Sequence, residues 1–491
     1  MKNNKRWTVF RFYLYCIPVI LIYSSFINGA SKRRKKNKDF YSAMYKDTHP
    51  FNVPEHSETD DNVWITIFVH GIMSIQPHLS LQNIMRFIRD DVHHTIYSKA
   101  VEYMRLDPYF YLNQAMQEFG LKKLDPDDLQ PGHAAHSIAN MYDTITKLVS
   151  PLTTNNYYTF GWSGLLSPTT RYADSIKLFN ELTKELEENY WKHGIFPKIR
   201  LIGYSHGGNV CLNIAAARQN TNPDSALSID ELILVGVPIQ TETDYLANDP
   251  IFKKIYHFFS QKDRIQRIDF FSFNRIFSRR YFRNSNNFKV PKKLMQIDMK
   301  FVRNAKTKHN TGARQAATMN FNNPGIISGK SKLLRDCSPG HLEFWFFGWS
   351  PKHYRESFVF NPLPAFITIP WILHYIKQIQ DEIVTPYPVI VDIRPEFETM
   401  LIKQRKCNNI THIFPFLSFE QVEELTTIAN KAVLDSSFED EYPSHVQDAF
   451  IKAKTYYKTY DERKSRSGSY KRNRRMRKRN LTVKEEKNNL N

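Results

Sequence analysis

The chain has few cysteines, and their spacing suits neither a disulfide framework nor a metal site. Its 491 residues include four, at Cys16, Cys211, Cys337 and Cys407. None of them form a CxxC pair, the spacing typical of thiol redox and zinc motifs. Cys16 lies in an apolar N-terminal run, which leaves three in the rest of the chain. The sequence therefore excludes a small disulfide-stapled fold and leaves the redox compartment open.

Acidic residues are missing from both ends of the chain. Residues 1–38 hold ten Lys or Arg and no acid, and residues 463–479 hold ten more, again with no acid. The net charge is +19, so removing these twenty cations leaves −1 for everything else. A body so close to neutral argues against a folded nucleic-acid-binding domain, because such domains carry a basic face.

The basic C-terminal segment, residues 461–491, is low in apolar residues and is predicted to be a disordered tail. Its cations suit phosphates, in anionic lipid or in nucleic acid. A solvated tail that only aids solubility fits the composition equally well.

Long hydrophobic runs are scarce, and the N-terminus is the exception. Residues 12–27 form an uncharged run of 16, with four basic residues before it and KRRKK soon after it. These are the parts of a signal peptide. The cleavage site is poor, however, because Asn28 occupies the third position before a cut after Ala30. An uncleaved membrane anchor is the rival, although a span usually needs about 20 residues. Residues 1–30 are predicted to be one or the other, which predicts an exported or membrane-anchored protein, and residues 31–60 a polar linker.

Short apolar runs alternate with helical patterns along the body of the chain. Helical spacing of apolar residues over 170–192 and the Ala-rich stretch 209–219 predict helices. Strands alternating with helices imply right-handed crossovers, and therefore an α/β fold with a mostly parallel central sheet and helices on both faces. Six runs are predicted as buried strands, at residues 63–71, 156–164, 198–208, 231–238, 254–263 and 293–301.

Two stretches exceed what a minimal sheet needs, and a third is notable for its apolar composition. Residues 72–155 are too long for one crossover, so crossover helices and an inserted lid or cap are predicted there, with a helix over 107–120. The polar stretch 302–336 is predicted to be a long loop. The apolar stretch 362–376 is broken by Pro364 and Pro370, which favours a packed helix over a membrane span. The folded domain as a whole is placed at residues 61–460.

The motif GYSHG places Ser205 between Gly203 and Gly207, after a predicted strand and before a predicted helix. A sharp strand-to-helix turn forces strained backbone angles on the serine and brings neighbouring backbone too close for side chains two residues away. The turn lifts the hydroxyl out of the sheet and aims a helix N-terminus, with its free N–H groups, at the same point. The motif therefore predicts a nucleophilic serine.

A serine hydroxyl needs a base, and the base needs a carboxylate to orient it. Asp263 ends the predicted strand 254–263, and His341 follows in the motif CSPGHLEFW. The order Ser, Asp, His suits a nucleophile on such a turn. The competing candidates are Asp244 and Asp269 for the acid, and His353 and His309 for the base.

An oxyanion formed on the substrate needs backbone N–H donors. The first donor is predicted to be His206, directly after the serine. The second is predicted in the turn FVHGIMS, at Ile72 or Met73.

Six motifs, in chain order, resemble the α/β-hydrolase superfamily, most closely its lipase and esterase branch, including lipase-like hydrolases related to GPI inositol-deacylases. They span about residues 60–350: FVHGIMS, TFGWSG, GYSHGGNV, GVPIQTETD, FFSQKDRIQ and SPGHLEFW. Tyr204 stands where many lipases carry histidine. The resemblance implies the α/β-hydrolase fold and the following roles: Ser205 as nucleophile, Asp263 as acid, His341 as base, and Ile72 and His206 as oxyanion donors.

The function that follows is a serine hydrolase that cleaves carboxylic esters, such as lipid or other hydrophobic acyl esters, through an acyl-enzyme and without a cofactor. No metal is expected, because the histidine pairs at 93–94 and 133–136 lack a carboxylate or cysteine pattern typical of a metal site. An aromatic and arginine-rich stretch, 267–288, suits an anionic surface or, as we favour, packing beside the site with solvated arginines. The alternatives are an inactive hydrolase scaffold acting as a membrane-associated binding protein, and a chain whose basic tail is the functional part.

Overall fold

The computed structural model describes most of the body of the chain. The predicted N-terminal signal or anchor, the linker and the basic tail lie outside the described residues, as does most of the predicted loop 302–336. The described residues are 63–73, 90, 92–194, 196–267, 278–286, 288–304, 334–349, 358–404, 411–432 and 440–459.

The chain divides into two compact units, residues 1–53 with 218–226 and residues 54–217 with 227–491. In the first unit, the described residues are the end of a helix and the turn that follows it. There the N–H of Asn222 donates to the carbonyl of Arg218 at 3.0 Å. The other described residues belong to the second unit.

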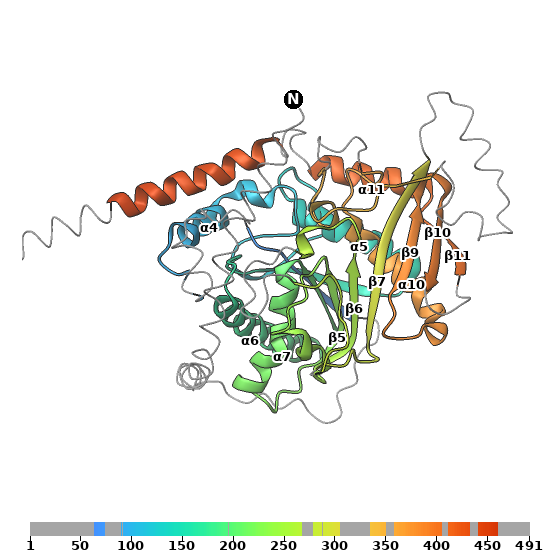
Figure 1. Cartoon of the computed structure of the whole chain (residues 1–491), viewed down its shortest axis with the longest axis horizontal. Coiled ribbons are helices and arrows are strands. Elements are labelled where there is room, and N and C mark those ends of the chain that lie inside the picture. The colour runs from blue at the N-terminus through green and yellow to red at the C-terminus, as the bar shows by residue number, and fades with distance from the viewer. Residues whose placement is uncertain are drawn as a thin grey trace, which may run out of the picture. The chain divides into compact units, whose positions relative to one another are not determined.

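An eleven-stranded sheet organises this unit (Figure 1). Its strands are β1 (Val63–Val69), β2 (Gly120–Lys123), β3 (Thr154–Gly161), β4 (Lys198–Tyr204), β5 (Ile229–Val235), β6 (Phe252–Phe259), β7 (Leu294–Asn304), β8 (Leu334–Asp336), β9 (Val389–Arg394), β10 (Thr399–Gln404) and β11 (Thr411–Pro415). They run in the order β11-β10-β9-β7-β6-β5-β4-β1-β3-β2, and β8 pairs with β7. The strands from β3 to β9 in this order are parallel, and β2, β8, β10 and β11 are antiparallel to their neighbours. The predicted α/β class with a mostly parallel sheet is confirmed.

Helices pack on both faces of the sheet. Alternate residues of β1 enter different cores, because successive side chains of a strand point to opposite faces. Ile65 and Ile67 pack in one core with α6 (Pro168–His193) and α7 (His206–Thr221). Phe68 packs in the other core with α5 (Ala134–Val149), α10 (Ile369–Gln378) and α11 (Phe419–Ala432).

All six predicted strands are present, as β1 and β3 to β7, and the two predicted helices are α6 and α7. Local signals set the ends of α6. Ser167 caps its first turn by accepting from the N–H of Thr170, Pro168 occupies the first turn, and Gly194 ends the helix at a φ of +67°.

The predicted helix over 107–120 is wrong. Only a short 3-10 turn, η1 (Pro108–Tyr111), forms there, and β2 begins at Gly120. Tertiary contacts take the backbone groups that a helix would use, since the buried guanidinium of Arg105 donates to the carbonyl of Gln117 at 3.0 Å. The rest of the described part of 72–155 holds α4 (Ile96–Leu106) and α5. The inserted lid stays a prediction.

The predicted packed helix in 362–376 is present as a 3-10 turn, η5 (Ala365–Thr368), followed by α10. Its apolar side chains are buried in the core, as Ile369, Ile372 and Ile376 illustrate. In the part of the chain that the structure describes, no helix combines the length and apolar character needed to cross a bilayer.

Candidate active site

The turn between β4 and α7 has the backbone strain expected of a nucleophile turn. Ser205 has a φ of +51°, in the left-handed region that non-glycine residues rarely adopt. A Cβ on Gly207 would lie 2.1 Å from the carbonyl oxygen of His70, and one on Gly203 would lie 2.6 Å from the Cα of Gly208. Both distances are far below van der Waals contact. The close approach of two backbone segments therefore requires glycine at these two positions.

The structure brings Ser205, Asp263 and His341 together. The Nε2 of His341 lies 2.9 Å from the Oγ of Ser205, and its Nδ1 lies 2.8 Å from the Oδ2 of Asp263. The three residues come from different elements. Ser205 follows β4, Asp263 follows β6, and His341 lies between β8 and a short turn, η4 (Leu342–Phe344). All three side chains are buried.

Backbone N–H groups hold the carboxylate of Asp263 in place. Its Oδ1 accepts from the N–H of Ile265 at 3.0 Å and from the N–H of Gln266 at 3.2 Å. Its Oδ2 is thereby directed at His341. A carboxylate can only accept, so the Nδ1 of His341 carries the proton and its Nε2 presents a lone pair to the hydroxyl of Ser205. This tautomer is the one a general base requires.

Tyr204 fixes the backbone of the histidine. Its hydroxyl donates to the carbonyl of His341 at 3.0 Å. Its ring lies 4.9 Å from the His341 ring and stacks on Trp345 at 5.0 Å with an interplanar angle of 3°. Burial raises the pKa of Tyr204 well above its ordinary value, so the hydroxyl keeps the proton that it donates. Sequence reasoning recorded Tyr204 only as a departure from the histidine that many lipases carry at this position, and missed this contact.

Gly236, at the end of β5, is a second site position that sequence reasoning missed. Its φ is +60°, and a Cβ there would lie 3.4 Å from the Oδ2 of Asp263 and 3.5 Å from the Nδ1 of His341. A Cβ at these distances would be in ordinary van der Waals contact, so it is the left-handed backbone angle, beside the Asp–His pair, that favours glycine here. The signal was present in the sequence GVP, where a strand pattern ends at a glycine.

The turn after β1 lies directly against the serine. A Cβ on Gly71 would sit 3.1 Å from the Cβ of Ser205. His70 is buried and braces this turn, since its Nδ1 lies 2.7 Å from the carbonyl of Gly71 and its Nε2 accepts from the N–H of Trp162 at 3.3 Å. Burial lowers the pKa of His70 well below its ordinary value, so the ring is neutral. Ile72 thus follows a turn whose position beside Ser205 is fixed.

His206 is the first residue of α7, so its N–H has no acceptor within the helix. Its side chain is buried, and a guanidinium nitrogen of Arg171 lies 2.6 Å from its Nδ1. The same guanidinium donates to the Oε1 of Gln240 at 3.1 Å. Burial first, and then the charge of Arg171, lower the pKa of His206 well below its ordinary value. The ring is therefore neutral, and its fixed side chain holds the start of α7.

Among the rival candidates, Asp244 is buried in an ion pair with Arg279. Asp269, His353 and His309 lie outside the described residues. The expectation of solvated arginines in 267–288 is wrong for two of them. Arg279 is in the pair just named, and the Nη2 of Arg280 donates to the backbone carbonyl of Asp263 at 2.9 Å, which ties this segment to the site.

A comparison with protein-family models finds no match to the chain, and a comparison with curated proteins finds none either. Inference about function therefore depends on the geometry of the site and on the motifs of the sequence.

Proposed function

We propose that the protein is a serine hydrolase of the α/β-hydrolase fold that cleaves carboxylic esters. The observation that carries the proposal is the pair of distances through His341, 2.9 Å to the Oγ of Ser205 and 2.8 Å to the Oδ2 of Asp263. Hydrogen bonds from nucleophile to base and from base to carboxylate are the geometric signature of activated serine nucleophiles.

The topology supports the choice of fold. The nucleophile turn follows β4, a strand in the middle of the parallel sheet, and the acid and the base follow later strands to one side of it. In an open parallel sheet, sites form beyond the carboxyl ends of the strands. The chain order Ser, Asp, His is the order this fold uses.

The reaction is proposed to proceed in two halves. The Oγ of Ser205 attacks the ester carbonyl while the Nε2 of His341 takes its proton, and Asp263 stabilises the imidazolium. The oxyanion is held by the N–H groups of Ile72 and His206. The C–O bond to the alcohol then breaks, the alcohol leaves with the proton from His341, and an acyl-enzyme remains. Water that gives its proton to His341 attacks the acyl carbonyl and releases the acid and Ser205.

An apolar cluster beside the oxyanion turn supports a hydrophobic acyl group as substrate. Met73 is buried with Leu165 and Leu166, and Ile72 packs against the same cluster. The helix over residues 440–459 joins this cluster, and the hydroxyl of Tyr442 donates to the carbonyl of Met73 at 3.1 Å. Burial of an acyl chain gains about 0.8 kcal/mol per CH₂ group. A chain lying along this cluster would therefore bind better as it lengthens.

Hydrolysis of p-nitrophenyl esters of increasing acyl length tests the proposal. We expect kcat/KM to rise with chain length, and Ser205→Ala and His341→Gln each to lower kcat by about 10⁴-fold or more. Ser137→Ala is the matched control, because Ser137 is an equally buried serine on α5. The proposal fails if the wild type hydrolyses none of the esters, or if Ser205→Ala hydrolyses them as fast as wild type.

A further inference from the structure

Two histidines and a carboxylate meet at the start of α5, in a region that the proposed hydrolase function does not use. The Oδ2 of Asp128 lies 2.6 Å from the Nδ1 of His133 and 3.5 Å from the Nδ1 of His136. The side chains are 23%, 47% and 14% exposed, respectively, so an ion can reach them from solvent. His133 is the residue that precedes α5, and its side chain makes no capping hydrogen bond to the helix.

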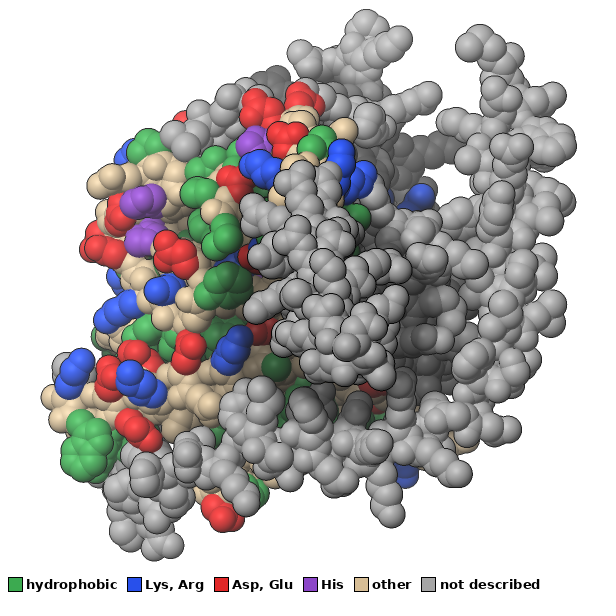
Figure 2. All heavy atoms as spheres, turned by 90° about the vertical axis from the view of Figure 1, so that its left-hand side faces the viewer, with side chains coloured by type: hydrophobic (Ala, Val, Ile, Leu, Met, Phe, Trp, Pro, Cys, Tyr) green, Lys and Arg blue, Asp and Glu red, His purple; other side chains and the backbone are tan. Residues whose placement is uncertain are grey.

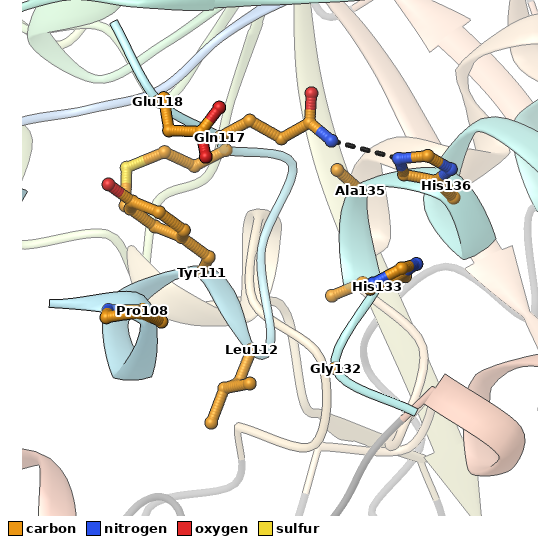
Figure 3. Close-up of a pocket in the computed structure, with 11 residues that line it drawn as sticks. Pro108, Tyr111, Leu112, Gln117, Glu118, Gly132, His133, Ala135 and His136 are labelled. Atoms are coloured by element: carbon orange, nitrogen blue, oxygen red, sulfur yellow. Dashed lines mark hydrogen bonds between the residues drawn. The ribbon is translucent and has the colours of Figure 1, made fainter. Parts of the chain in front are cut away.

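The two histidines lie at the edge of a cavity of about 240 Å³ between η1 and the start of α5 (Figure 3). Tyr111, Leu112 and Gln117 also line the cavity. Figure 3 shows His133 and His136 on successive parts of the chain that enters α5, with the side chain of Gln117 reaching His136.

The spacing of these atoms fits a tetrahedral ion. Zn²⁺ binds nitrogen and oxygen at about 2.0–2.1 Å, which places ligand atoms roughly 3.3 Å apart. The 3.5 Å between His136 and Asp128 is already close to this value. His133 and Asp128 are hydrogen-bonded, with 2.6 Å between Nδ1 and Oδ2. When the ion replaces the shared proton, these two atoms would move apart by less than about 1 Å. His133 is the most exposed of the three, so its ring is the one with space to move.

Further polar atoms are placed as a metal site requires. The carbonyl oxygen of Asp125 lies 3.0 Å from the Nδ1 of His136, where it can complete the coordination. The amide nitrogen of Gln117 lies 2.9 Å from the Nε2 of His136, the ring nitrogen that faces away from Asp128. When Nδ1 binds the ion, Nε2 carries the proton and needs an acceptor, so the Gln117 amide has to rotate and present its Oε1. The Oγ1 of Thr159, which lies 3.3 Å from Oε1 in the metal-free protein, then accepts from the amide nitrogen.

We propose that Asp128, His133 and His136 bind one Zn²⁺ ion. Two imidazoles select a transition ion over Ca²⁺ or Mg²⁺, which prefer oxygen ligands throughout. The ion links the loop after β2 to the first turn of α5, a helix that packs in the core on one face of the sheet. The role is structural. This revises the expectation of no metal, because the carboxylate lies only five residues before His133.

Zn²⁺ binding to the metal-free full-length chain, purified without a histidine tag, tests the site. We expect calorimetric titration with Zn²⁺ to give one saturable site per chain. Asp128→Asn and His133→Ala should each weaken it at least tenfold, and Gln117→Leu about tenfold. The melting temperature of the wild type should rise with Zn²⁺ concentration, while that of Asp128→Asn should not.

The matched control is His412→Ala. His412 also pairs with one carboxylate, its Nε2 lying 3.0 Å from Glu382, and it is 34% exposed. We expect this variant to bind Zn²⁺ as wild type does. Far-UV circular dichroism identifies any variant that fails to fold, and the surface position of His133 makes His133→Ala the safest of them. The proposal is overturned if the wild type has no saturable site, or if Asp128→Asn and His133→Ala bind with unchanged affinity.

Discussion

At the scale of single residues, the site depends on side chains that orient the reacting groups as much as on those groups themselves. His341 sits in a loop rather than on a strand, and a loop needs anchoring if its ring is to meet the Oγ of Ser205. Tyr204 provides an anchor, because it precedes the nucleophile directly and holds the backbone carbonyl of His341 at 3.0 Å. One short segment therefore positions the nucleophile and its base together.

Removal of the Tyr204 hydroxyl should slow the reaction without unfolding the protein. Tyr204→Phe keeps the stack on Trp345 and loses only the hydrogen bond to His341. Such a bond contributes about 1 kcal/mol. We expect kcat to fall about fivefold with KM nearly unchanged, because the base is misplaced while the binding surface is intact. Steady-state kinetics on the preferred ester measures this split.

Tyr157→Phe is the control for that experiment. Tyr157 is a buried tyrosine that donates to a single partner, the Oδ1 of Asp143, at 3.0 Å. Its loss should lower stability to a similar extent and leave kcat at the wild-type value. Equal kcat values for Tyr204→Phe and wild type would show that Tyr204 has no positioning role.

At the scale of elements, the turn from β4 into α7 fits against the end of β1 with no space to spare. Gly207 allows the first turn of α7 to rest on the carbonyl of His70, and Gly203 allows β4 to pass α7. The same approach places the start of α7 and the turn after β1 on either side of Ser205. The packing that holds the sheet and helix together is therefore also what forms the proposed oxyanion site.

Gly207→Ala should be strongly destabilising. The new Cβ would lie 2.1 Å from one backbone carbonyl oxygen and 2.6 Å from another, and backbone atoms yield less easily than side chains. We expect a loss of about 3 kcal/mol or more in the free energy of unfolding. Gly194→Ala is the comparison, since its Cβ meets nothing within 4 Å and only its φ of +67° is unfavourable. That cost is about 1–2 kcal/mol. Urea unfolding monitored by fluorescence measures both, and equal losses would contradict the packing argument.

Sequence patterns predicted the elements whose signal is local and missed those set by distant partners. The strands β1 and β3 to β7 are continuous apolar runs, so they could be found, whereas β9, which also pairs in parallel, was not predicted. β10 and β11 escaped notice because they form by antiparallel pairing at the edge beyond β9. The segment 107–120 was misread as a helix because the partners that hold its backbone, such as Arg105, come from another element.

The same division applies to the candidate site. Ser205, Asp263 and His341 could be named because each falls at the end of a strand or in a recognisable motif. Tyr204 and Gly236 could not be assigned, because their importance comes from contacts with His341 and Asp263 across the fold. Asp128 was missed for the opposite reason. Its position near the two histidines was visible in the sequence, but only the fold of the loop shows that it turns back onto them.

At the scale of the whole molecule, charges of both signs are mixed on the face shown in Figure 2, and the protonation of buried groups is shifted in the interior. The face in Figure 2 carries interspersed acidic and basic side chains, in agreement with a body near neutrality. Inside, burial lowers the pKa of His257 to about 3. Although burial opposes it, Arg200 and Lys377 lower the pKa of Glu231 to about 2. The core thus holds neutral histidines and a paired carboxylate.

These shifts predict loss of stability in acid in two stages. His70, His206 and His257 stay neutral when folded, but an unfolded histidine takes up a proton below about pH 6.5. The unfolded state then binds more protons, so the free energy of unfolding falls as pH drops from 6.5, by up to about 2 kcal/mol per histidine at pH 5. Glu231 adds a second fall below about pH 4.5, because its pKa is lowered in the folded state.

Urea unfolding at a series of pH values measures this dependence. The slope of the free energy of unfolding against pH is set by how many more protons the unfolded state binds than the folded state. His257→Gln should lower that number by one between pH 6.5 and 5. His374→Gln, at a partly buried histidine whose pKa burial lowers by less than that of His257, should reduce that slope by less than His257→Gln does. A free energy of unfolding that does not change between pH 7 and 5 would contradict the account of the buried histidines.

The most direct test of the central claim is covalent labelling of the full-length protein with a fluorophosphonate, followed by peptide mass spectrometry. Such probes react with a serine hydroxyl only when a neighbouring base activates it. We expect one adduct on the peptide that contains Ser205, none in Ser205→Ala, and much slower labelling in His341→Gln. A wild-type protein that stays unlabelled, or an adduct on a different residue, would contradict the claim that Ser205 is an activated nucleophile.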